Sequence, residues 1–158
     1  MGEETPGRRV VDSKVEMTEI VLPEDSNPRG AIFGGRVLAL VDKCAAIAAH
    51  RHARSDVTTV SFDSVEFRHT VRVGNILILH GRLNAAFGSS MEIEVEVLAE
   101  DPATGARTLT TRALVTMVAL GPDGRPRKVP PLLTADEEDR RRAREAAARR
   151  ARRLAERP

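Results

Sequence analysis

The sequence of 158 residues predicts a single α+β domain, in which a curved antiparallel sheet wraps one long apolar helix. The first observation is the run 34–49, which is apolar nearly all round and long enough for a buried helix. The second is that every segment from there to residue 120 reads as extended chain. Consecutive strands with short turns form an antiparallel meander, and a helix that is apolar on most sides needs a sheet curved around it.

The first elements are a strand and a loop that leads into the helix. Residues 1–12 are polar, and we expect them to be flexible. Residues 14–21 alternate and predict a half-buried strand, whereas residues 24–30 are rich in turn formers. The helix then begins at Gly34 and ends near His52, where basic side chains suit the unpaired carbonyls of a helix C-terminus.

Four strands follow the helix. The clearest pattern has Glu92, Glu94 and Glu96 alternating with apolar residues, which predicts one face in the core and one in water. The predicted strands cover residues 57–67, 76–83, 91–97 and 107–120.

A charged helix ends the chain. Thr134 is the expected cap, so we divide the chain into the domain 13–133 and the helix 134–158. We interpret the arginines of this helix as a solvated face, with phosphate binding or contact with a second subunit as the alternatives.

Composition excludes several classes of protein. The net charge of +2 comes from the final helix, where nine arginines face six acids, so it is weak evidence for nucleic-acid binding. Tyr and Trp are absent, which leaves little for base stacking. The single cysteine, Cys44, is expected to be a small buried hydrophobe, and the four histidines lack metal-ligand spacing. No signal peptide or membrane-spanning stretch is evident, so we expect a cytoplasmic protein that acts without membrane or nucleic acid.

One acid lies inside the apolar helix. Asp42 shares its face with Leu38, Ala39, Ala45 and Ala46. Burying a carboxylate there costs free energy unless the carboxylate is paired. Asp42 is therefore either a structural carboxylate with a hydrogen-bonding or ionic partner, or a catalytic group.

The residues around Asp42 resemble a known family. The stretch 21–35, VLPEDSNPRGAIFGG, followed by LVD at 40–42, is similar to the signature of hotdog-fold acyl-CoA thioesterases, the YciA-type and cytosolic acyl-CoA hydrolase subfamily. The likeness covers about residues 15 to 145. It implies a hotdog fold, in which an antiparallel sheet of five to six strands wraps one long central helix, with a charged C-terminal helix added. It also implies a homodimer with shared active sites, assembled further as a trimer of dimers, and an acyl-CoA substrate with no cofactor.

The resemblance assigns Asn27 of one protomer and Asp42 of the other to a single thioester. Backbone amides at the helix start, at Gly34 and Gly35, can stabilise the oxyanion that forms when water attacks, and glycine lets the substrate come close. Such a donor supplies roughly 10²–10³ in rate, and a positioned carboxylate roughly 10²–10⁴. Asn27 can hold either the water or the carbonyl, and Asp42 can act as general base or as nucleophile.

The resemblance also suggests where the rest of the substrate binds. The pantetheine would lie along residues 60–67, including Ser61, and along the loop with Ser89 and Ser90. Arg68 is the phosphate candidate, with an exposed turn charge as the alternative. Phe33 and Gly34 complete the expected substrate contacts. Family members often have Pro near position 70, where this sequence has Thr70.

Two other functions fit the same fold. One is a non-catalytic acyl-CoA-binding or sensing module, which would not need Asp42. The other is an acyl-thioester dehydratase, which commonly uses a histidine opposite the helix acid, but residues 24–33 contain none. A sheet with so few strands also leaves an edge, so we expect a dimer with one sheet continuous across its two-fold axis.

Overall fold

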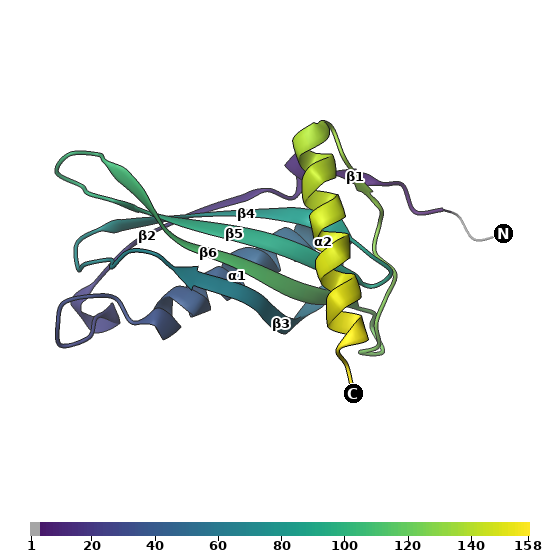
Figure 1. Ribbon diagram of the computed structural model, residues 1–158, viewed down its shortest axis with the longest axis horizontal. Helices are drawn as coiled ribbons and strands as arrows, with labels where there is room; N and C mark the ends of the chain where they lie inside the picture. Colours follow the sequence, from purple (N-terminus) through teal and green to yellow (C-terminus); the bar gives the residue numbers. More distant parts are fainter. Residues whose placement is uncertain (1–3) are drawn as a thin grey trace.

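A five-stranded antiparallel sheet forms the body of the protein, with its strands in the order β2-β4-β5-β6-β3 (Figure 1). The structure is a computed structural model that describes residues 4–158. The sheet confirms the predicted α+β class and the antiparallel pairing. The predicted meander of four strands is only partly correct, because β4, β5 and β6 are consecutive neighbours but β3 pairs with β6 rather than with β4. Its strands are β2 (Val15–Ile20), β3 (Asp56–Phe67), β4 (Ile76–Ala86), β5 (Ser90–Glu100) and β6 (Arg107–Leu120).

The central helix α1 (Gly34–Ala53) packs against one face of this sheet. Cys44 is fully buried there, as predicted, and burial raises the pKa of its thiol to about 12. A Cβ atom on Gly81 of β4 would lie 2.8 Å from the Cys44 sulfur. Glycine at this position therefore lets helix and sheet approach closely.

One side of α1 is not covered by its own chain. Gly35, Ala39, Lys43 and Ile47 are exposed, and Asp42 is only half-buried. These four exposed residues recur every fourth position, which places them in one row along the helix. The prediction of a helix buried nearly all round therefore fails within one protomer, because the sheet covers only part of the helix circumference.

The C-terminal helix α2 (Glu137–Ala155) crosses the opposite face of the sheet (Figure 1). It covers Glu92 and Glu94, which are each only 2% exposed. Arg149 binds both carboxylate oxygens of Glu92, at 2.6 and 3.0 Å, and Arg142 lies 2.7 Å from Glu94. The prediction that these glutamates face water is wrong, because the arginines of α2 cover and neutralise them.

The arginines of α2 thus serve two purposes. Arg142 and Arg149 bind the sheet, whereas Arg140, Arg141 and Arg144 form exposed ion pairs with glutamates of the helix itself. The interpretation of the whole helix as a solvated face is therefore only partly correct.

The segment before the sheet pairs with the segment that precedes α2. The short strands β1 (Arg8–Arg9) and β7 (Leu132–Leu133) pair in parallel, and Val10 is buried, so part of the segment predicted to be flexible packs against the domain. Residues 1–3 of that segment lie outside the described residues.

The cap of α2 is Asp136 rather than Thr134, since the Asp136 side chain accepts a hydrogen bond from the Asp139 amide. Two short 3-10 helices, η1 (Val10–Asp12) and η2 (Pro23–Asp25), complete the secondary structure. Of the helices that the structure describes, none has the length and hydropathy to cross a membrane.

Candidate active site

Asp42 is held by a residue of the neighbouring strand. The hydroxyl of Thr59 in β3 donates a hydrogen bond of 2.6 Å to Asp42 Oδ1. Among residues 4–158, no other side chain forms a hydrogen bond or an ion pair with this carboxylate. Asp42 Oδ2 is therefore available to accept a hydrogen bond from another molecule. The carboxylate is therefore oriented but not neutralised.

The start of α1 presents unused backbone amides. The helix has no side-chain cap, and its first amides in hydrogen bonds are those of Arg36 and Val37, which both donate to the Phe33 carbonyl. The Gly34 and Gly35 amides make no hydrogen bond within the described residues. A Cβ atom on Gly35 would meet nothing within 4 Å. The protomer's own packing therefore does not require glycine at Gly35, and the approach of another molecule explains it better.

Asn27 lies in the loop before α1, and the oxygen of its side-chain amide already accepts two hydrogen bonds. Its Oδ1 accepts hydrogen bonds from the Arg29 and Ala31 amides, at 2.9 and 3.2 Å. Because backbone amides can only donate, this contact identifies the oxygen and leaves the Asn27 NH₂ group as a donor. The Asn27 side chain therefore offers a donor to a further group, which can be a carbonyl oxygen or a water oxygen.

An ion pair ties the Asn27 loop to α1. Asp25 accepts a hydrogen bond of 2.9 Å from Arg36 Nε and another of 3.0 Å from the Leu22 amide. The Asp25 carbonyl accepts the Phe33 amide, at 3.0 Å. Asp25 therefore holds both ends of the loop that carries Asn27 against the first turn of the helix.

A cleft of about 340 Å³ opens at this end of α1. Asn27, Gly34, Phe67 and Arg68 line it, together with His69. Asp42 is not among the lining residues. Since α1 rises about 1.5 Å per residue, Asp42 lies about 10 Å along the axis from Gly35. One protomer therefore does not bring its own Asp42 and Asn27 to the same point.

The other predicted substrate contacts divide between the two ends of the sheet. Ser90 pairs with Val118 of β6, which in turn pairs with Thr58, so the loop with Ser89 and Ser90 lies near Thr59. Two strand spacings separate them, about 10 Å. This loop belongs to the Asp42 half of the site.

Ser61 and Arg68, two further predicted substrate contacts, have side chains that already bind other residues of the protomer. The Ser61 hydroxyl donates to Asp63, which also accepts from Thr116 on the face covered by α2, so the Ser61 side chain points away from Asp42. Arg68 pairs with Glu66 at 2.7 Å, and this hydrogen bond lowers the pKa of Glu66.

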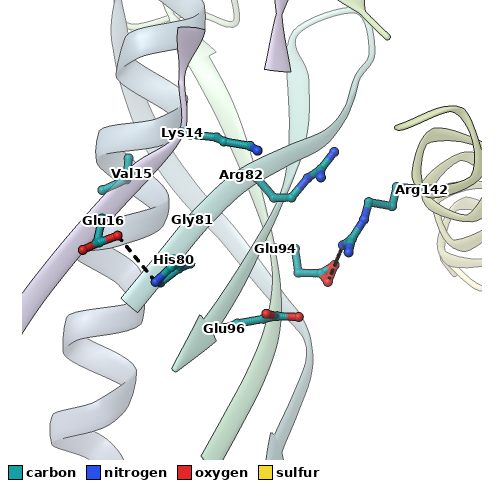
Figure 2. A pocket seen from close by; sticks show the side chains of 9 residues that line it. All are labelled: Lys14, Val15, Glu16, His80, Gly81, Arg82, Glu94, Glu96 and Arg142. Carbon is teal, nitrogen blue, oxygen red and sulfur yellow. Dashed lines mark hydrogen bonds and ion pairs between the residues drawn. The ribbon is translucent and has the colours of Figure 1, made fainter. Parts of the chain in front are cut away.

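A second cavity of about 340 Å³ lies on the α2 side of the sheet (Figure 2). Charged side chains of both signs surround it, and the Arg142–Glu94 ion pair forms one wall. It shares no residue with the cleft at Asn27 and lies on the other face of the sheet from Asp42. We therefore place the candidate site at α1. Within residues 4–158, no cluster of three or more His, Cys, Asp or Glu side chains is arranged to hold a metal ion.

Comparisons with known proteins identify the family. The sequence matches the family model of the thioesterase superfamily over residues 29–106. A Bacillus subtilis relative, the uncharacterized acyl-CoA thioester hydrolase YkhA, is 36% identical over 137 residues, which are 86% of this chain and 80% of the relative. The chain therefore belongs to the thioesterase superfamily, and its sheet wrapped around α1 is the hotdog fold.

Solved structures share nearly the whole fold. The acyl-CoA hydrolase of Staphylococcus aureus, in complex with butyryl coenzyme A and coenzyme A, has a TM-score of 0.88 and 33% identity, and the match covers 95% of this chain and 92% of that chain. An apo-hexameric acyl-CoA thioesterase has a TM-score of 0.90 and 42% identity, with 97% and 100% covered. The mouse cytosolic acyl coenzyme A thioester hydrolase is 32% identical over 139 residues, but the chain spans only 36% of its length.

Three further structures of the S. aureus hydrolase each carry one alanine substitution. The replaced residues are an aspartate, an asparagine and a threonine.

Two residues near the site are not evident from the sequence. Thr59 lies in a strand rich in β-branched residues, so the sequence carries no signal of its contact with Asp42. His69, one of the four histidines without metal-ligand spacing, lines the cleft beside Asn27.

Proposed function

We propose that this acyl-CoA thioesterase hydrolyses its substrate between two protomers, with Asp42 from one and Asn27 from the other. Asp42 Oδ2 either takes a proton from the attacking water or attacks the thioester carbon itself to form a mixed anhydride, which water then hydrolyses. By either route the carbon–sulfur bond breaks, CoA leaves as the protonated thiol, and the acyl group leaves as the free acid. The Asn27 NH₂ group and the Gly34 and Gly35 amides stabilise the oxyanion. The observation that carries the proposal is the Asp42 carboxylate, which Thr59 orients while one oxygen stays free.

The spacing of three residues supports these roles. In the S. aureus hydrolase, the replaced asparagine, aspartate and threonine lie 15 and then 17 positions apart, as do Asn27, Asp42 and Thr59 here. Relatives named as acyl-CoA thioester hydrolases and a neighbour with bound butyryl coenzyme A support the substrate class.

The edge of the sheet supports a shared site. β3 is an edge strand, and its Val60 and Phe62 are 50% and 38% exposed. Two copies of β3 paired antiparallel about a two-fold axis would place the start of one strand beside the end of the other. Thr59 and Asp42 of one protomer would then approach the cleft of its partner, and the exposed row on α1 would be covered. This dimer is the unit that we propose.

The same proposal extends to assembly and location. Solved neighbours described as hexameric support a trimer of dimers. The cytosolic mouse relative supports a cytoplasmic location, and no cofactor takes part in the proposed chemistry. Phe33, Ser89 and Ser90 remain predicted substrate contacts, as do Arg68 and, through its backbone, Ser61.

The first test is hydrolysis of a panel of acyl-CoAs by the wild type and by Asp42→Ala and Asp42→Asn. Loss of a positioned base should lower kcat by roughly 10²–10⁴. CoA binding, measured by calorimetry, should persist in both variants. If either variant hydrolyses acyl-CoA as fast as the wild type, the role of Asp42 is refuted.

A second test examines the sharing of sites. Asn27→Ala and Asp42→Ala chains, each inactive alone, should regain part of the activity when they are mixed and exchange subunits, because some mixed dimers carry one intact site. Exchange shown by native mass spectrometry without recovered activity would contradict the shared site. A single turnover in ¹⁸O-water, with label sought in Asp42, distinguishes nucleophile from base.

A further inference from the structure

The unpaired cations of α2 begin at Arg150. The helix's earlier arginines pair with glutamates, as described above, but Arg150 forms no ion pair within residues 4–158. Its guanidinium instead lies over the ring of Phe87, 4.9 Å from the centroid. Phe87 belongs to the β4–β5 loop, so this contact holds Arg150 beside Ser89 and Ser90.

A second basic segment runs along the same loop. The Val129 amide donates to the Gly88 carbonyl at 2.9 Å, which places the preceding residues Arg127 and Lys128 next to the loop. Arg125 lies two residues before Arg127, at the end of the turn that leads into this segment. Arg125, Arg127 and Lys128 are all exposed, and none forms an ion pair among the residues that the structure describes.

We propose that Arg125, Arg127, Lys128 and Arg150, the loop-side basic cluster, bind the phosphate groups at the nucleotide end of CoA. Guanidinium and ammonium groups are the side chains that bind phosphate most strongly. The acid nearest in sequence, Asp123, accepts the Arg125 amide within its own turn. The four cations are thus free to bind an anion.

The position of the cluster fits the path of the substrate, and this step rests on the proposed function. Thr59, which orients Asp42, lies one residue from Thr58, and Thr58 faces Ser90 across β6. A thioester at Asp42 with its pantetheine arm along Ser89 and Ser90 delivers the nucleotide to the loop-side basic cluster. Arg68, the earlier phosphate candidate, already pairs with Glu66, whereas the four cations of the cluster have no carboxylate partner among residues 4–158.

The test compares two substrates that differ only in the nucleotide. The triple variant Arg127→Ala/Lys128→Ala/Arg150→Ala should raise KM for acyl-CoA at least tenfold and leave kcat within twofold. KM for the matching acyl-pantetheine should not change, because that substrate has no nucleotide. The control Arg140→Ala/Arg141→Ala/Arg144→Ala removes the same charge from α2 and should leave both KM values unchanged.

A binding measurement separates this proposal from the proposed function. Adenosine 3′,5′-bisphosphate should inhibit the wild type competitively and the loop-side triple variant at least tenfold more weakly. An unchanged KM for acyl-CoA in that variant, or an equal rise for acyl-pantetheine, would overturn the proposal, as would a rise confined to Arg68→Ala. If the wild type hydrolyses neither substrate, the proposed function fails, while calorimetry with CoA still decides whether the cluster binds the nucleotide.

Discussion

Thr59 Oγ1 and Asp42 Oδ1 lie 2.6 Å apart, and this hydrogen bond connects the edge strand β3 to the central helix. It restricts the rotation of a carboxylate that is half-buried and has no cationic partner among the described residues. Because the Thr59 hydroxyl donates to Oδ1, the lone pairs of Asp42 Oδ2 remain free to accept a proton or a hydrogen bond. The strand that should form the dimer edge thus also orients the candidate catalytic acid.

Replacement of Thr59 by Val should lower kcat by about 10- to 100-fold, because a hydrogen bond to a charged group is worth about 1.5–3 kcal/mol. KM should change little, since valine has nearly the same shape. Thr59→Ser keeps the hydroxyl and should retain most of the activity. Steady-state kinetics on both variants tests this, and equal activity of Thr59→Val and wild type would show that the contact is only structural.

Gly35→Ala should separate folding from catalysis. Among the described residues, the added methyl group meets no side chain and no backbone outside its own helix turn within 4 Å, and alanine favours helix over glycine by about 1 kcal/mol. The melting temperature should therefore stay the same or rise. If the substrate carbonyl approaches the Gly35 amide, the methyl group should obstruct it and lower kcat, by up to the roughly 10²–10³ that one oxyanion donor supplies. A variant that melts like the wild type and also turns over like it would remove Gly35 from the site.

Arg149→Met should destabilise the fold strongly. Arg149 is the cation that pairs with the buried Glu92, and without it that carboxylate keeps only its hydrogen bond from Asn84. A buried charge without its counterion costs about 3–5 kcal/mol, which urea unfolding would detect. Arg144→Met removes an exposed pair with Glu137 and should leave the urea midpoint unchanged. Similar midpoints for the two variants would show that α2 does not stabilise the sheet.

His52 should make the fold sensitive to mild acid. Burial lowers the pKa of His52 from its ordinary value of 6.5, and this outweighs the opposite effect of its hydrogen bond with the Pro130 carbonyl. As the pH falls below 6.5, the unfolded chain binds a proton that the folded protein does not, so the free energy of unfolding decreases. The loss is at most about 1.4 kcal/mol per pH unit. Urea unfolding of wild type and His52→Gln should show a shallower pH dependence in the variant above the range where carboxylates titrate.

The sequence predicted the elements well where local pattern decides them. The apolar run of α1 and the alternation in β5 were sufficient to place a helix and a core-facing strand. The surroundings of Glu92 and Glu94 were not predictable in this way, because the residues that cover them come from 48 or more positions later in the chain.

The candidate site was predictable only in part. Asn27, Asp42 and the helix-start glycines came from a compact motif, but Thr59 meets Asp42 across a helix-to-strand turn that no spacing rule indicates. The expected burial of Asp42 is incomplete in one protomer, since the surface beside it is the row that a second copy would cover.

Glu92 and Glu94, which α2 covers, determine how a chain without this helix would behave. A chain that stops at residue 133, where the sequence suggested a boundary, would expose Glu92 and Glu94 beside Asn84 without Arg142 or Arg149 to offset their charge. Such a chain would leave Glu92 without its cation and Glu94 with Arg112 alone, and Arg82 would lose Asp139, so the terminal helix is an integral wall of the domain and a poor place for trimming or for an inserted cleavage site.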